Sequence, residues 1–271
     1  MAGVSGCVLK SIPENCAGDL RAVFGSQFYE PDAARTIRRL VTEKADMEFD
    51  LVIFDCDGVL VDSEPISNRV LAEYVSELGY RLTTEQSIQA FVGHTMADVK
   101  RIAERLIGRP APADFLDELQ RRSASAFARE LKPVEGIVEL LERLPMACCV
   151  ASNGSLEKMH STLGVTGLLP RFHDRLFCPD NTGVGKPNPR IYLTPAEQFG
   201  VEPERCAVVE DGVLGVQAAR AAGMTAFGYA APGNEAALRT AGAITFRQMR
   251  ELPRLLGVGT RLIGGEGAGA S

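Results

Sequence analysis

Short apolar runs alternate with stretches of helical pattern from Phe49 onward, and this alternation restricts the fold more than any other feature of the chain. Each run is four to six residues long, and the runs cover 49–54, 147–151, 175–178, 206–209 and 225–229. Runs that are so short and so uniformly apolar are typical of strands buried on both faces of a sheet. Their alternation with helices predicts an α/β fold built on a doubly wound parallel sheet.

Helix signals occupy the intervals between the predicted strands. Ser155 is a candidate cap for a helix over 156–163, and Asn188 with Pro189 provides a cap and first turn for a helix over 190–199. A third helix is predicted over 213–222, ending at Gly223.

A stretch of about 85 residues between the first two predicted strands breaks the alternation and has an entirely helical pattern. Apolar residues recur there every four positions, at Ile66, Val70, Tyr74 and Leu78. Further helices fit 84–90, 95–107 and 113–130. The pattern predicts a small all-helical domain inserted into a Rossmann-like core.

These patterns divide the chain into four predicted parts. Residues 47–64 and 132–256 form the α/β core, and 65–131 form the helical domain. Residues 1–46 are predicted to be an extension, either poorly ordered or upstream of a true start at Met47, with one helical candidate over 31–44. The Gly- and Ala-rich tail, 257–271, is expected to be disordered.

Composition argues against several classes of function. The chain has 29 Lys and Arg against 35 Asp and Glu, a formal net charge of −6, and no basic block, so nucleic acid is not an expected partner. No run approaches the roughly 18 apolar residues of a membrane span, so a membrane is not expected either. Seven cysteines without a Cys-x-x-Cys pair favour a reducing cytoplasm as the location.

Three aspartates, Asp55, Asp57 and Asp62, follow directly on the first predicted strand. Their carboxylates should stand at the carboxyl edge of the sheet, where open parallel sheets bind ligands. Like charges raise one another's pKa, so a divalent cation or a role for a protonated form would resolve the repulsion. A turn whose aspartates cap the next helix is the alternative interpretation.

Polar residues follow other predicted strands in the same way. Ser152 and Asn153 come after the second run, and Glu210 and Asp211 come after the run 206–209. Lys186 lies in the loop after the run 175–178. Each alone is also explained as a helix cap or a solvated loop cation. Their common placement at strand ends predicts one shared site.

In this arrangement the sequence resembles the haloacid dehalogenase superfamily, and within it the sugar-phosphatase and phosphoglucomutase-like group with a helical cap. The resemblance covers roughly 49–256, and its four motifs occur in family order as Asp55-x-Asp57, Ser152, Lys186 and Glu210-Asp211. It implies a phosphatase of small phosphate monoesters, such as sugar phosphates or sugar-acid phosphates like 6-phosphogluconate. A small phosphorylated metabolite is the implied partner, and the protein is expected to be a monomer or small homo-oligomer.

The resemblance also implies a role for each site residue. Asp55 would be the nucleophile that becomes an aspartyl phosphate, and Asp57 the general acid and base. Mg²⁺ would be held by Asp55, the backbone carbonyl of Asp57, and Asp211. Glu210 is a fourth candidate ligand, either directly or through water.

Phosphate binding is assigned to a second set of residues. Ser152, its neighbouring backbone N–H groups and Lys186 would bind the phosphoryl oxygens, and Asn153 is a further substrate-binding candidate. The helical domain would act as a cap that closes over the substrate. His94, in the cap loop, is a candidate substrate contact, with a solvated histidine at a helix start as the alternative.

Three alternatives are weighed against hydrolysis. A dehalogenase has no use for Asp57 and Asp211. A sugar phosphomutase of the family has a histidine in the cap linker and an arginine in the cap loop, where this chain has Ser67 and Met96. A non-catalytic module that binds a phosphate ligand is the third alternative, although every catalytic residue type is present.

Overall fold

The computed structural model describes residues 49–258 with the exception of Gly93, His173 and Pro232. The predicted extension 1–46, its helical candidate over 31–44, and all but the first two residues of the predicted tail therefore lie outside the described residues.

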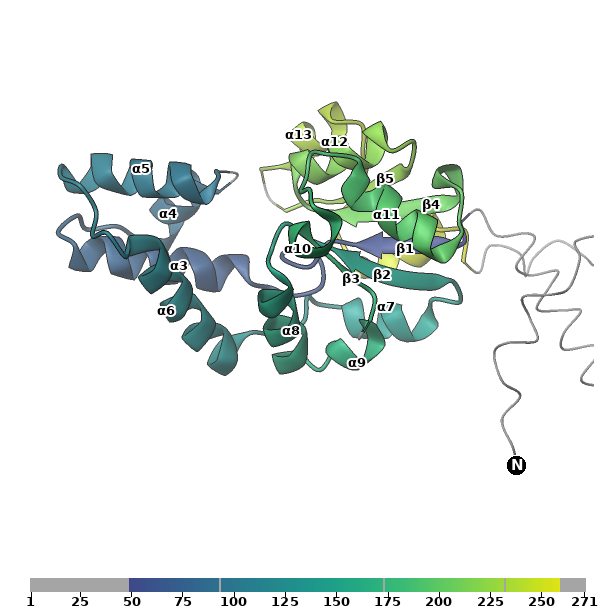
Figure 1. The fold of residues 1–271 in the computed structure, drawn as a ribbon, viewed down its shortest axis with the longest axis horizontal. Coiled ribbons are helices and arrows are strands. Elements are labelled where there is room, and N and C mark those ends of the chain that lie inside the picture. The colour runs from purple at the N-terminus through teal and green to yellow at the C-terminus, as the bar shows by residue number, and fades with distance from the viewer. Residues whose placement is uncertain (1–48, 93, 173, 232, 259–271) are drawn as a thin grey trace, which may run out of the picture. The chain divides into compact units, whose positions relative to one another are not determined.

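A parallel sheet forms the centre of the fold, as predicted, with six strands among the described residues in the order β3-β2-β1-β4-β5-β6 (Figure 1). The strands are β1 (Leu51–Phe54), β2 (Ala147–Ala151), β3 (Leu176–Phe177), β4 (Cys206–Glu210), β5 (Thr225–Tyr229) and β6 (Ile244–Phe246). Strands β2 and β3 are added on one side of β1, and strands β4, β5 and β6 are added on its other side. The carboxyl ends of β1 and β4 therefore form the switch point at which such sheets bind ligands.

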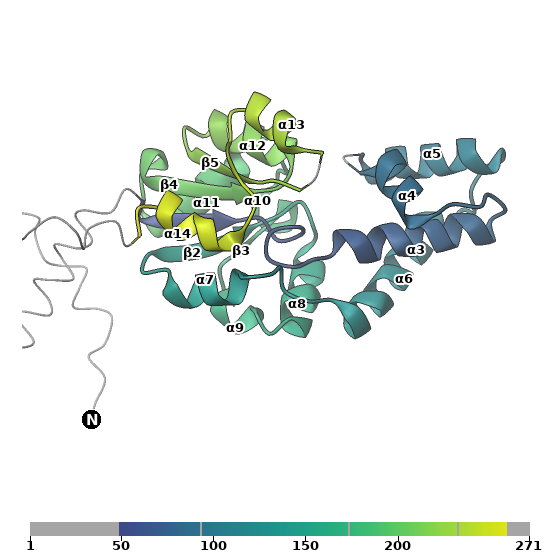
Figure 2. The same cartoon turned by 180° about the vertical axis from the view of Figure 1, so that it is seen from behind.

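Helices cover both faces of this sheet (Figures 1 and 2). They are α7 (Ile137–Arg143), α8 (Leu156–Val165), α9 (Leu169–Phe172), α10 (Pro179–Thr182), α11 (Arg190–Phe199), α12 (Val213–Ala221), α13 (Glu235–Thr240) and α14 (Leu252–Leu255). The doubly wound α/β architecture is thereby confirmed. Ser155 caps α8 as predicted, because its side chain accepts a hydrogen bond from the backbone N–H of Lys158.

Five helices lie between β1 and β2 among the described residues: α7, which covers the sheet, and four that precede it and form the helical insert. These four are α3 (Glu64–Glu77), α4 (Thr84–Phe91), α5 (Met96–Ile107) and α6 (Phe115–Glu130). They share a buried apolar cluster distinct from that of the sheet, in which Tyr74 stacks on Phe115 at 5.1 Å between ring centroids. The inserted all-helical domain is thus present, while its predicted boundaries at residues 65 and 131 stay a prediction.

The secondary structure differs from the prediction at the edges of the sheet. Strand β3 has two residues instead of the predicted four, and β6 was not predicted. Strand β6 lacks the uniform apolar signal because Ile244 is half exposed and Thr245 is polar. Among the described residues, no helix is long and apolar enough to cross a membrane.

Candidate active site

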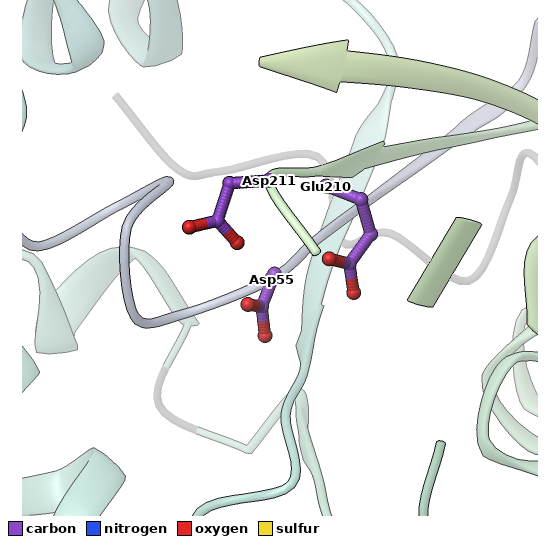
Figure 3. Close-up of side chains that lie close together, drawn as sticks. All are labelled: Asp55, Glu210 and Asp211. Carbon is purple, nitrogen blue, oxygen red and sulfur yellow. The ribbon is translucent and has the colours of Figure 1, made fainter. Parts of the chain in front are cut away.

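The carboxylates predicted at the sheet edge meet at the ends of β1 and β4. Asp55 follows β1, Glu210 ends β4, and Asp211 comes next. Phe54 pairs with Val209 in the parallel register, so the two strand ends stand at the same level. Figure 3 shows the three side chains gathered in one place, and one oxygen from each lies within 4.8 Å of the others.

Lys186 supplies the positive charge of this cluster. Its Nζ lies 2.6 Å from Oδ1 of Asp55 and 2.5 Å from Oε1 of Glu210, and its side chain is only 6% exposed. Burial lowers the pKa of Lys186, but the two carboxylates outweigh burial and raise the pKa above its ordinary value. The ammonium is therefore fixed beside Asp55.

Asn153 holds the loop that carries Lys186. The side-chain Oδ1 of Asn153 accepts a hydrogen bond of 2.7 Å from the backbone N–H of Lys186, and its Nδ2 donates one of 3.4 Å to the backbone oxygen of the same residue. Both bonds involve the side-chain amide of Asn153, and its predicted substrate contact stays a prediction. Ser152 is buried directly after β2, and its Oγ accepts a hydrogen bond of 3.1 Å from the N–H of Gly154.

Asp57 has two side-chain partners that the sequence analysis missed. Its Oδ1 accepts a hydrogen bond of 2.6 Å from Ser63, and its Oδ2 lies 2.7 Å from Nζ of Lys158. Burial raises the pKa of Asp57, but Lys158 and Ser63 together bring the pKa below its ordinary value. A lysine in the first turn of a helix opposes the helix dipole, and this was the sequence signal available for Lys158.

Tyr192 and the backbone of Gly212 complete the surroundings of Glu210. The Tyr192 hydroxyl donates a hydrogen bond of 2.6 Å to Oε1 of Glu210, and the N–H of Gly212 donates one of 3.1 Å to Oε2. Burial and the charge of Glu210 raise the pKa of Tyr192 well above its ordinary value, so the hydroxyl keeps its proton. The sequence pattern gave no signal for this role, because Tyr192 occupies a core position of α11.

His94 lies between α4 and α5, and its side chain is exposed. Its backbone N–H donates to the oxygen of Phe91. Within the described part of the chain, no contact of the His94 side chain with the carboxylate cluster is present, so its predicted substrate contact stays a prediction.

The electrostatics of the cluster suit a bound cation. Burial raises the pKa of Asp55 to about 7, since Lys186 offsets the burial only in part and Glu210 adds a like charge. Burial also raises the pKa of Asp211 well above its ordinary value, and Asp55 and Glu210 add to this effect. A divalent cation that neutralises these carboxylates would remove their mutual repulsion and stabilise their ionised forms.

The donor atoms and their spacing fit Mg²⁺, which prefers oxygen ligands. Gly58 brings the loop after β1 close to the cluster, at a φ of +78°. A Cβ at Gly58 would lie 2.0 Å from Oδ2 of Asp211, so only glycine permits this approach. Asp55 and Asp211 are the carboxylates that would hold the ion. Glu210, which is also bonded to Lys186, Tyr192 and Gly212, stays a predicted fourth ligand.

Comparison with known proteins agrees with this fold. A 6-phosphogluconate phosphatase of Escherichia coli (strain K12) is 32% identical to the chain over 205 residues, which cover 75% of this chain and 93% of that protein. A fructose-1-phosphate phosphatase of the same strain is 31% identical, with coverage of 65% and 93%. A crystal structure of a HAD family hydrolase from Deinococcus radiodurans R1, with bound phosphate and sodium, superposes with a TM-score of 0.70 at 34% identity, covering 78% of this chain and 96% of that one.

The family profile of the haloacid dehalogenase-like hydrolases matches residues 49–223, which contain β1, β4 and all the residues of the carboxylate cluster. The chain belongs to the haloacid dehalogenase-like hydrolases.

Proposed function

We propose that this hydrolase is a Mg²⁺-dependent phosphatase of small phosphate monoesters, in particular sugar or sugar-acid phosphates, and that it acts through an aspartyl phosphate on Asp55. The contact of Lys186 with Asp55, 2.6 Å long and buried at the switch point of the sheet, is the observation that carries the proposal. This contact supports the proposal because the mechanism needs a carboxylate nucleophile close to a cation that binds phosphate. The names of the two Escherichia coli relatives support the substrate class.

Asp55 would carry out the first half-reaction. A carboxylate oxygen of Asp55 attacks phosphorus, the P–O bond to the sugar breaks, and Asp57 gives a proton to the leaving alkoxide. Lys186 binds the phosphoryl group and stabilises the negative charge that spreads over its oxygens. When bound, Mg²⁺ would neutralise Asp55 and Asp211 and polarise the phosphoryl group.

Asp57 would act as a base in the second half-reaction. Water attacks the phosphorus of the aspartyl phosphate, Asp57 takes a proton from that water, and the bond to Asp55 breaks to release inorganic phosphate. Ser63 and Lys158 hold both oxygens of Asp57, and their bonds favour the ionised form that this step requires.

Phosphate release from a panel of sugar and sugar-acid phosphates, with Mg²⁺ and with excess EDTA, tests the proposal. The expected result is metal-dependent release that Asp55→Asn abolishes, because an amide is a poor nucleophile. Phosphorus NMR of the same reactions separates hydrolysis from mutase action, which would yield an isomeric sugar phosphate. No release from any substrate would refute the phosphatase and leave a module that only binds phosphate.

A further inference from the structure

Glu210 is the most completely bonded carboxylate of the cluster. It is 1% exposed, and its Oε1 receives hydrogen bonds from Tyr192 and Lys186 while its Oε2 receives one from the backbone of Gly212. A carboxylate held by donors on both oxygens has little freedom to turn toward a metal ion. Its position is therefore set by those three donors.

Tyr192 is the one of the two side-chain donors that has no role in the proposed reaction. It is fully buried on α11, and its ring packs in the apolar cluster of the sheet. A buried hydroxyl requires a partner, and the core offers many positions where phenylalanine would pack equally well. The hydroxyl of Tyr192 instead extends to Glu210 with a bond of 2.6 Å.

Lys186 connects this pair to the reacting group. Its Nζ lies 2.5 Å from Glu210 and 2.6 Å from Asp55. The strength of the ion pair with Glu210 therefore determines how strongly the ammonium interacts with Asp55. If Glu210 moves away, the positive charge of Lys186 falls on Asp55 alone. A cation that binds Asp55 must then compete with that ammonium.

We propose that Tyr192 is a positioning residue whose hydroxyl fixes Glu210 as the counter-ion of Lys186, and thereby keeps Asp55 available to the metal ion. Tyr192 touches neither substrate nor metal in this scheme and acts through Glu210. The inference rests on the metal site of the proposed function.

Direct metal binding tests the inference without any substrate. Mn²⁺ is titrated by calorimetry into the metal-free full-length chain and into Tyr192→Phe, which keeps the ring and removes only the hydroxyl. We expect the variant to bind Mn²⁺ about tenfold more weakly, as is typical when a partner of a metal-site residue is lost. Tyr74→Phe is the matched control, since Tyr74 is a buried tyrosine in the helical domain, and its affinity should equal that of the wild type.

A double-mutant cycle with Glu210→Ala shows whether Tyr192 acts through Glu210. In the Glu210→Ala background, Tyr192→Phe should change the Mn²⁺ affinity less than about twofold, because the group it positions is gone. Fully additive effects would overturn the inference. If the double variant does not fold, the comparison of Tyr192→Phe with Tyr74→Phe decides the question.

A purely structural role predicts a different result. Tyr192→Phe would then lower the thermal midpoint of the metal-free protein while its Mn²⁺ affinity stayed that of the wild type, and this outcome would overturn the inference. A protein that shows the expected loss of Mn²⁺ affinity but hydrolyses no phosphate ester would refute the proposed function alone. Absence of Mn²⁺ binding by the wild type would refute both.

Discussion

The ammonium nitrogen of Lys158 lies 2.7 Å from Oδ2 of Asp57, although the two residues are 101 positions apart in the chain. The other oxygen of Asp57 is bonded to Ser63, so the proposed acid and base is held at both oxygens. These bonds favour the ionised carboxylate and lower its pKa. The proposed first half-reaction needs the protonated form, so Lys158 should control the pH at which it is fast.

Lys158→Met should therefore raise the pKa of Asp57 and move the alkaline limb of kcat/KM to higher pH. A shift of about one pH unit or more is expected, because a single close charge moves a carboxyl pKa by about one to three units. The measurement is kcat/KM between pH 4 and pH 9 with a sugar phosphate. Lys132→Met, at an exposed lysine, is the control and should leave the profile unchanged. An identical alkaline limb in Lys158→Met and wild type would contradict the assignment.

Asp55→Asn should stabilise the metal-free fold at alkaline pH. Burial raises the pKa of Asp55 from 3.8 to about 7, so the folded state favours the protonated group. Stability is then lost as the pH rises from about 4 to about 7, and the asparagine variant escapes this loss. With EDTA present at pH 8, the free energy of unfolding of the variant should exceed that of the wild type by on the order of 2 kcal/mol, and its thermal midpoint should be higher. At pH 5 both differences should be much smaller. A wild type that is the more stable protein at pH 8 would contradict the raised pKa.

Metal binding should release protons from the carboxylate cluster near neutral pH. The pKa of Asp55 is raised to about 7 and that of Asp211 well above its ordinary value, whereas a metal ion binds the ionised forms. Calorimetry of Mg²⁺ binding in two buffers of different ionisation enthalpy gives the number of protons released. More protons should be released at pH 6 than at pH 9, and fewer from Asp55→Asn than from the wild type at pH 6. Binding with no release at pH 6 would count against a site built on Asp55 and Asp211.

The sequence was sufficient to locate the carboxylate cluster at the edge of the sheet, because the positions of strand ends depend on local pattern. Asp55 and Glu210 stand at the ends of uniformly apolar runs, and parallel strands bring those ends together. The short edge strand β6 was missed, since a strand of three residues, in which Ile244 is exposed and only Phe246 is buried, carries almost no periodicity.

The partners that orient the site could not be predicted from local pattern. Lys158 reaches Asp57 only through the tertiary packing of α8, which contacts α6 and β3, and Tyr192 has the pattern of an ordinary core residue of α11. Asn153 follows β2, and the bonds of its amide to the Lys186 backbone depend on the loop conformation, which local pattern does not specify. Side-chain roles of this kind are decided by tertiary contacts, while strand ends are decided by sequence pattern.

Gly215 offers a test of how tightly Glu210 is packed. It lies inside α12, where replacing glycine by alanine normally stabilises a protein by about 1 kcal/mol. A Cβ at this position, however, would lie 1.8 Å from Oε1 of Glu210 and 2.0 Å from its Cδ, far inside contact distance. Glu210 cannot move away without breaking its bonds to Lys186 and Tyr192.

Gly215→Ala should therefore destabilise the protein, by about 1 to 3 kcal/mol as is common for an overpacked core, and lower phosphatase activity at least tenfold. Gly164→Ala is the matched control, because Gly164 also lies inside a helix and its added Cβ would meet only Leu169 at 4.0 Å. Chemical denaturation and kcat/KM are measured for both variants. The control should gain up to about 1 kcal/mol and keep its activity. If Gly215→Ala behaves like the control, Glu210 is free to move, and the fixed link from Glu210 through Lys186 to Asp55 cannot be a requirement of the site.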